Sequence, residues 1–245
     1  MTRQASTAQQ TLVKQWNDVI AAIAKLHSSA MVRPEDGWTI FKPVDQLAGK
    51  FELTPVVFKL PENTRAQSMQ SQVVLDLYVV VAGSITVRPD ENSRKALITQ
   101  EFTTRVAYFR HRPHGLLHVY GTHCDFALNK VGHPIFHSQL RSFSEYAKCV
   151  RERYGVGGDD DKDLVKSLLQ NVRVPTAQMD VFSVFLQLCA DHLLGKSSGE
   201  RQKQVFDDLV RENKFLRGAA SQAPHMMSQT AASCYRANHW YPAPS

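Results

Sequence analysis

The sequence predicts an α+β fold: an N-terminal helix, then an antiparallel sheet, then a helical C-terminal half packed on one face of that sheet. Three observations predict it. Apolar residues recur at helical spacing over residues 8–28, two-residue alternation dominates residues 71–143, and helical spacing returns from residue 144 onward. We expect about five strands between residues 71 and 143.

The N-terminal helix is expected over residues 8–28. Its apolar face is formed by Leu12, Trp16, Val19, Ile20, Ile23, Ala24 and Leu26. Trp38 to Phe41 is expected to form a short strand. The rest of the segment up to about Gln70 mixes polar residues and prolines without a clear period, so we expect only one or two short elements there.

The sheet is expected to begin at Ser71, where the run to Val81 is dominated by β-branched residues. Gly83 to Val87 is expected to be a hairpin return, and Leu97 to Arg110 the next strand. In that strand Ile98, Phe102, Val106 and Tyr108 alternate with Thr99, Glu101, Thr103 and Arg105. Such alternation is typical of a sheet with one packed face and one face in water.

Helical patterns follow the sheet at Ser144–Tyr154, Lys162–Gln170, Ala177–Leu194, Glu200–Leu216 and Ala219–Ala237. The third of these has the strongest apolar stripe and is expected to cover the packed face of the sheet. We expect residues 1–195 to form an α+β core domain. Residues 196–245 are expected to form a helical extension with an aromatic tail that docks on the core.

Composition narrows the class of protein. Hydrophobic residues make up 43% of the 245 residues and charged residues 21%, which is ordinary for a globular protein. The net charge of +6 allows nucleic acid as a partner, but Lys and Arg are scattered and form no basic block. The sequence has no apolar run of about 18 residues and no signal-peptide pattern, so we expect no membrane association.

The four cysteines stand alone, at Cys124, Cys149, Cys189 and Cys234. None forms a C-x-x-C pair, which argues against a structural zinc of the finger type. Their spacing gives no disulfide framework either, which fits a reducing compartment. We therefore expect a cytoplasmic protein.

The most informative stretch is residues 115–143, which contains four of the ten histidines. Alternation along its first half places His123 and Asp125 on one face and His118 on the other. After a loop, His133-Pro134 opens a second strand, in which His137, Gln139 and Arg141 share a face. A hairpin with its turn near Lys130 would put His123 opposite His137, with Asp125 one step along.

Two imidazoles and a carboxylate at that distance could bind one divalent metal, zinc or manganese, or could share a proton. The metal-ligand candidates are His123, Asp125 and His137, and Gln139 joins them as a catalytic candidate. Arg105 and Arg141 are candidates for binding a phosphate. The alternative is that these are structural polar residues on a half-exposed sheet face.

Asp191-His192 could add ligands to the site, but a surface pair at a helix end is the more ordinary explanation. The sequence contains no nucleophile elbow, no H-E-x-x-H helix, no dinucleotide-binding glycine pattern and no kinase signature. Familiar enzyme classes with those motifs are therefore not indicated.

The motifs His123-x-Asp125, His133-Pro134-x-x-His137 and Arg173-Val174-Pro175 occur in that order ahead of an apolar helix. Over residues 105–195 the chain resembles a set of uncharacterised bacterial proteins with an H-P-x-x-H hairpin and an R-[IV]-P segment. Such proteins are often found on phage-defence or mobile islands. The resemblance implies a bacterial, cytoplasmic setting and no particular activity.

Three functions follow as hypotheses, and whether the protein is an enzyme stays open. The first is a non-catalytic component of a bacterial defence or toxin-type system, acting through contacts with a protein partner or through self-association. The second is a metal-dependent hydrolase of the phosphodiesterase or nuclease type, with the His/Asp cluster as its metal site. The third is a nucleic-acid-binding protein without catalysis, suggested by the net charge alone.

Overall fold

The computed structural model describes most of the chain. The described residues are 3–45, 49–60, 76–90, 93–112, 115–126, 136–141, 143–156, 159–160, 173–175, 179–194 and 198–213. The predicted turn near Lys130, the predicted helix at 162–170 and everything after residue 213 lie outside them.

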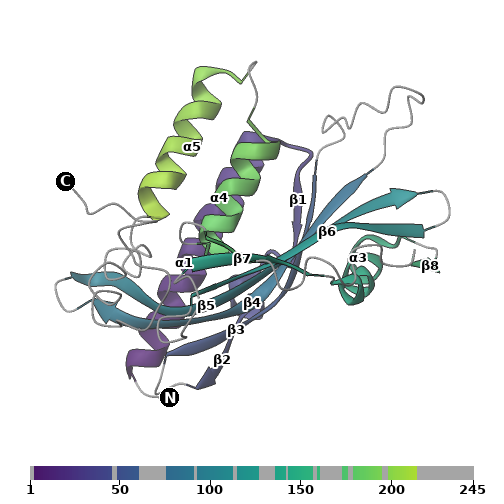
Figure 1. The fold of residues 1–245 in the computed structure, drawn as a ribbon. Helices are drawn as coiled ribbons and strands as arrows, with labels where there is room; N and C mark the ends of the chain where they lie inside the picture. The colour runs from purple at the N-terminus through teal and green to yellow at the C-terminus, as the bar shows by residue number, and fades with distance from the viewer. Residues whose placement is uncertain are drawn as a thin grey trace.

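Helices and strands follow one another in the order shown in Figure 1. They are α1 (Arg3–Leu26), β1 (Met31–Arg33), α2 (Gly37–Ile40), β2 (Phe41–Asp45), β3 (Lys50–Lys59), β4 (Leu77–Asp90), β5 (Ser93–Arg112), β6 (Gly115–Phe126), β7 (Phe136–Leu140), the 3₁₀ turn η1 (Ser144–Tyr146), α3 (Ala147–Tyr154), β8 (Asp159–Asp160), β9 (Arg173–Pro175), α4 (Val181–His192) and α5 (Glu200–Glu212). The α+β class, the N-terminal helix and the helical C-terminal half are confirmed.

The sheet has more strands than the sequence predicted. Its order among the described residues is β1-β3-β4-β5-β6-β7-β9, with antiparallel pairing throughout that path. Two further strands join it: β2 pairs with β3, and β8 pairs with β6 in parallel. The added strands β1 to β3 come from the segment before residue 71, where prolines and charged residues hid the alternation.

Two local expectations were wrong. Gly83 to Val87 is not a hairpin return, because β4 continues through it to Asp90 and the chain turns back only there. Trp38 lies in the short helix α2, which the carboxylate of Asp36 caps by accepting a hydrogen bond from the Trp38 backbone N–H at 3.1 Å. An aspartate in that position favours a helix start over a strand.

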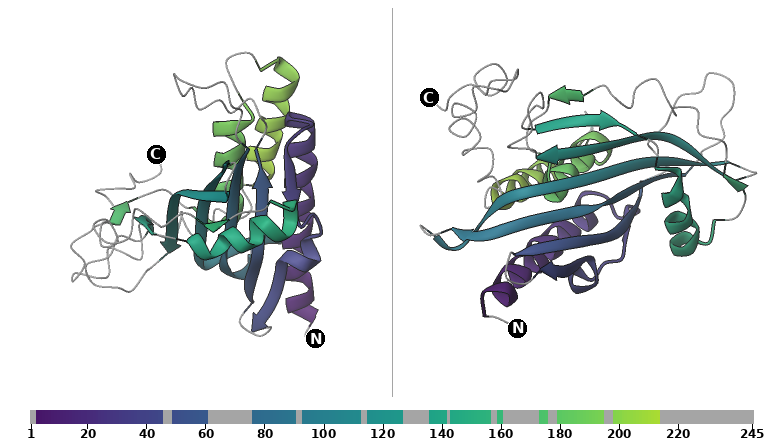
Figure 2. Two further views of the ribbon diagram at one scale, coloured as in Figure 1. Left: turned by 90° about the vertical axis from the view of Figure 1, so that its right-hand side faces the viewer. Right: turned by 60° about the horizontal axis from the view of Figure 1, so that its bottom comes forward.

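One face of the sheet carries the main core. Helices α1, α4 and α5 gather on that side, as both views of Figure 2 show. Phe185 of α4 is completely buried between Trp16 of α1 and Phe58 of β3, at ring-centroid distances of 5.0 and 6.2 Å. The prediction that this apolar helix covers the packed face is confirmed.

The opposite face is covered differently. The short helix α3 packs over one end of it through Ala147 and Val150, against a second apolar cluster that includes Val80, Ala107 and Phe109. The other end of this face carries Arg105 and the polar residues described below. Helix α3 therefore covers only part of the face on which the candidate site lies.

Two β-bulges change which side chains face which way. In β5, Glu101 pairs with Thr86 and Thr99 with Val87, so one extra residue lies between them. Thr99, expected in water, is consequently turned inward and is 1% exposed. A bulge of this kind reverses the alternation for the rest of the strand.

The second bulge lies in β6. Tyr120 pairs with Tyr108 while His118 pairs with Phe109, which leaves Val119 as the extra residue. His118 therefore lies on the same face as His123, and the expectation that they lie on opposite faces was wrong. The His118 ring packs edge-on against Phe109, with ring centroids 5.2 Å apart.

No helix among the described residues is both long enough and apolar enough to cross a membrane.

Candidate metal site

Strands β6 and β7 carry the site, in a register two residues from the predicted one. Asp125, not His123, lies opposite His137, and His123 lies opposite Gln139. Because the displacement is an even number of residues, every side chain keeps its predicted face. His123, Asp125, His137 and Gln139 therefore share one face, as expected, and the cluster forms.

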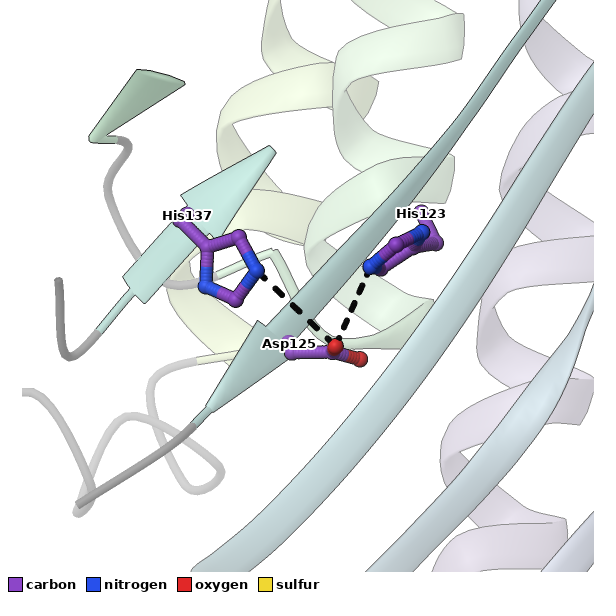
Figure 3. Close-up of side chains that lie close together, drawn as sticks. All are labelled: His123, Asp125 and His137. Carbon is purple, nitrogen blue, oxygen red and sulfur yellow. Dashed lines mark ion pairs between the residues drawn. The ribbon is translucent and has the colours of Figure 1, made fainter. Parts of the chain in front are cut away.

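The two imidazoles approach one carboxylate oxygen. Nε2 of His123 lies 3.2 Å from Oδ2 of Asp125, and Nε2 of His137 lies 3.9 Å from the same oxygen. The imidazole rings are 5.9 Å apart and nearly perpendicular. Figure 3 shows both rings pointing at the carboxylate from neighbouring strands.

The environment keeps Asp125 ionised. Burial acts to raise its pKa, but the hydrogen bonds from His123 and Thr103 and the nearby charges of both histidines outweigh burial and lower that pKa. The other carboxylate oxygen, Oδ1, is buried and has no hydrogen-bond partner among the described residues, and the same holds for Nδ1 of His123. A buried polar atom without a partner is costly, so this cluster is chemically incomplete as it stands.

A divalent metal would complete the cluster. One ligand atom from each of His123, Asp125 and His137 lies within 4.8 Å of the other two. Tetrahedral zinc with bonds of about 2.1 Å needs its ligand atoms roughly 3.4 Å apart, so a small inward shift of His137 would suffice. Three protein ligands and one open position are the arrangement of catalytic zinc sites, and two histidines with one carboxylate also suit other divalent metals.

The predicted arginines are placed differently with respect to the cluster. Arg105 of β5 pairs directly with His123, on the same face. Its Nη1 donates to the hydroxyl of Tyr146 at 3.4 Å, and that contact raises the pKa of Arg105 against a smaller opposing effect of burial. Arg141, in contrast, extends over the ring of Phe143, with its guanidinium carbon 5.9 Å from the ring centroid.

Asp191 and His192 do not add ligands to the cluster. They lie at the end of α4, on the helix-covered side of the sheet, where Nε2 of His192 is 3.4 Å from the hydroxyl of Tyr108. Of the two explanations that the sequence left open for this pair, an additional set of ligands is thus the wrong one.

Cys124 lies between His123 and Asp125 in the chain but points to the helix-covered face, as the alternation of β6 requires. Burial raises the pKa of its thiol to about 11, so the thiol is protonated at neutral pH. Among the described residues, Cys149 belongs to α3 and Cys189 is a buried residue of α4. Cys124 and Cys189 therefore lie on the opposite side of the sheet from the His/Asp cluster.

Sequence reasoning missed two residues of the site. Thr103 lies opposite Asp125 in the sheet, and its hydroxyl helps to lower the pKa of that carboxyl group. The alternation of β5 had already placed Thr103 on this face, and only the β5–β6 register was needed to find the contact. Tyr146, the partner of Arg105, sits in a 3₁₀ turn outside the sheet, and no sequence pattern signals its contact.

Comparison with known proteins gives one informative similarity. The chain is 29% identical over 149 residues to the protein N-terminal asparagine amidohydrolase of Mus musculus. The match covers 57% of this chain and 47% of that relative, so the chain spans less than half the length of the curated relative it matches. No protein-family model matches the chain, and no solved structure does.

Proposed function

We propose that the protein is a metal-dependent hydrolase that cleaves a carbon–nitrogen amide bond. The observation that carries the proposal is the convergence of Nε2 of His123 and Nε2 of His137 on Asp125, beside a buried carboxylate oxygen that has no partner in the described part of the chain. Similarity to an asparagine amidohydrolase supports an amide as the bond cleaved. It is the reason for preferring an amide over the phosphodiester that we expected from the sequence.

The reaction needs only water as the second substrate. The water oxygen bonds to the carbonyl carbon, the carbon–nitrogen bond breaks, and the nitrogen leaves as ammonia with protons from the water. A divalent metal bound here would polarise the carbonyl and lower the pKa of water. His123, Asp125 and His137 would bind the metal, and Thr103 would fix the carboxylate through its hydrogen bond.

A thiol mechanism is not supported by the described residues. Covalent amide hydrolysis requires a nucleophile within hydrogen-bond reach of a base. On this face His123 is paired with Arg105 on one side and Gln139 on the other. Asp125 is paired with Thr103 and His137. Neither a cysteine nor a serine is among them, and Thr103 carries the one hydroxyl. Both imidazoles are directed at Asp125 and not at a hydroxyl, which favours an activated water.

The test is ammonia release from the side-chain amide of asparagine, both as the free amino acid and at the amino terminus of a dipeptide. Protein purified without an affinity metal is assayed as isolated, after chelation, and after adding zinc or manganese, with its metal content measured in parallel. We expect near-stoichiometric metal and activity that disappears on chelation. His137→Ala and Asp125→Asn should lose both.

His192→Gln is the matched control. It changes a half-buried histidine on the other side of the sheet, so metal content and ammonia release should persist. Absence of metal in the wild-type protein together with no ammonia release from either substrate would reject the hydrolase.

The non-catalytic role in a bacterial defence or toxin-type system remains a second proposal, as does a cytoplasmic location. Its support is an exposed stretch of β6, where Val119 and Tyr120 are 43% and 40% exposed. Among the described strands β8 pairs only with the start of β6 and β7 only with its end, which leaves this stretch open to a protein partner. Nucleic-acid binding, which rests on net charge, also stays a prediction.

A further inference from the structure

We propose that Arg105 binds a carboxylate of the substrate, and that the substrate is therefore an amide with a free carboxylate close to the bond that is cleaved. The inference rests on the proposed hydrolase function and narrows its substrate class. A free amino acid with a side-chain amide fits this description. The same side chain at the amino terminus of a protein does not, because its α-carboxyl group is part of a peptide bond.

The position of Arg105 carries the first part of the argument. Arg105 and His123 are paired residues of β5 and β6, and Thr103 and Asp125 are the neighbouring pair. Paired side chains of antiparallel strands leave the sheet on the same face with their Cβ atoms about 5 Å apart. The guanidinium thus begins directly beside the His/Asp cluster, and its length lets it reach over a ligand bound there.

The free hydrogen-bonding capacity of Arg105 carries the second part. Its only hydrogen bond among the described residues goes to the neutral hydroxyl of Tyr146, at the long distance of 3.4 Å. The carboxylates of Asp125 and Glu145 are near enough to help raise the pKa of Arg105, but neither forms an ion pair with it within 4.0 Å among the described residues. A guanidinium has five N–H donors in a planar fork that matches the two oxygens of a carboxylate.

Charge balance points the same way. A divalent metal and Arg105 would contribute three positive charges, against two negative charges from Asp125 and Glu145, which leaves the site with a net positive charge. Such a site attracts a substrate with a carboxylate and repels one with an ammonium group in that position. Free asparagine and the N-terminal asparagine of a protein both carry an α-ammonium group, and only free asparagine has an α-carboxylate, so this chain would differ in substrate from the relative whose name specifies N-terminal asparagine.

Arg141 provides the matched comparison. It belongs to the same face and is equally exposed, but it stacks over Phe143 at 5.9 Å and is not paired with any residue of the cluster. If general positive charge were enough, Arg141 would matter as much as Arg105. If the direct pairing with His123 matters, only Arg105 will affect substrate choice.

The experiment uses two probes that differ only in the group in question, L-aspartate and its α-amide. Both keep the side-chain carboxylate that hydrolysis of asparagine would produce, and only the first has a free α-carboxylate. Calorimetric titration of the protein, at measured metal content, should show about tenfold tighter binding of L-aspartate. Arg105→Gln should abolish that difference, Arg105→Lys should retain part of it, and Arg141→Gln should leave it unchanged.

The outcomes separate this inference from the proposed function. Equal affinity for both probes, a preference that survives Arg105→Gln, or no binding of either probe would overturn the role of Arg105. Ammonia release from asparagine with no such preference keeps the hydrolase and rejects the carboxylate contact. A preference that requires Arg105, without any ammonia release, keeps the carboxylate contact and rejects the hydrolase.

Discussion

One face of the sheet is closed by α1, α4 and α5, whereas the other is covered at one end by α3 and carries a polar cluster at the other. On the first face the largest side chains are fully buried and contact one another, as Trp16 and Phe185 do. On the second, His123 and the half-buried Asp125 each leave one buried polar atom without a partner among the described residues. The difference teaches that the same strands support close apolar packing on one side and a polar cluster with unpaired buried atoms on the other.

The largest effect should come from the helix-covered face. Phe185→Ala removes a fully buried ring and should lower the free energy of unfolding by about 3–5 kcal/mol. Val150→Ala changes the corresponding buried residue of α3 and should lower the free energy of unfolding by roughly 1–2 kcal/mol, because it removes only two methyl groups. Urea denaturation measures both, with the exposed Gln187→Ala on α4 as the control. An equal loss of unfolding free energy in Phe185→Ala and Val150→Ala would contradict the difference between the two faces of the sheet.

An intermediate effect is expected at Gly121, which lies between the cluster and His118 on the same face. A Cβ at this position would collide with the carbonyl oxygen of Arg141 and lie 3.0 Å from Nε2 of His118. Gly121→Ala should therefore push β7 away from β6 and lower stability by about 1–3 kcal/mol. It should also reduce the metal bound per chain, because His137 belongs to β7.

The control for that variant is Gly199→Ala, since a Cβ at Gly199 meets nothing within 4 Å. Urea denaturation and metal analysis apply to both variants. Full metal binding in Gly121→Ala would show that the two strands need not stay in close contact for the site to form.

The smallest expected effect is a change of folding stability with pH, and it comes from His192 on the helix-covered face. Burial lowers the pKa of His192 below 6.5, with a smaller opposing effect from Asp191. The unfolded chain therefore binds a proton more readily than the folded one, and stability should fall as the pH drops through about 6.5. Denaturation midpoints at pH 7.5 and pH 5 measure the slope, and His192→Gln should make it shallower. An unchanged slope would remove His192 from the acid response.

Much of the fold followed from periodicity. The apolar stripes of α1 and α4 and the alternation in β5 are strong signals, since burial on one face requires them. Strands β1 to β3 were missed because Pro43, Pro55 and several charged residues interrupt the pattern at an edge of the sheet.

The sequence predicted which residues form the candidate site, but it did not predict the register between β6 and β7. His123, Asp125, His137 and Gln139 share a face in both the expected and the observed pairing, because the two differ by an even step. The partners of Asp125 and Arg105 could not be predicted in the same way. Thr103 depends on the register of a third strand, and Tyr146 on a turn whose position no local pattern determines.

The extra residue at Val119 has a consequence for comparing this chain with others. His118 and His123 are separated by five positions, an odd number, yet they lie on one side of the sheet. In an unbroken strand only even separations do so. The one extra residue in β6 moves every following side chain to the other side of the sheet. A relative without it would have the same two histidines four positions apart. Motifs in this strand should therefore be aligned by side of the sheet rather than by fixed spacing.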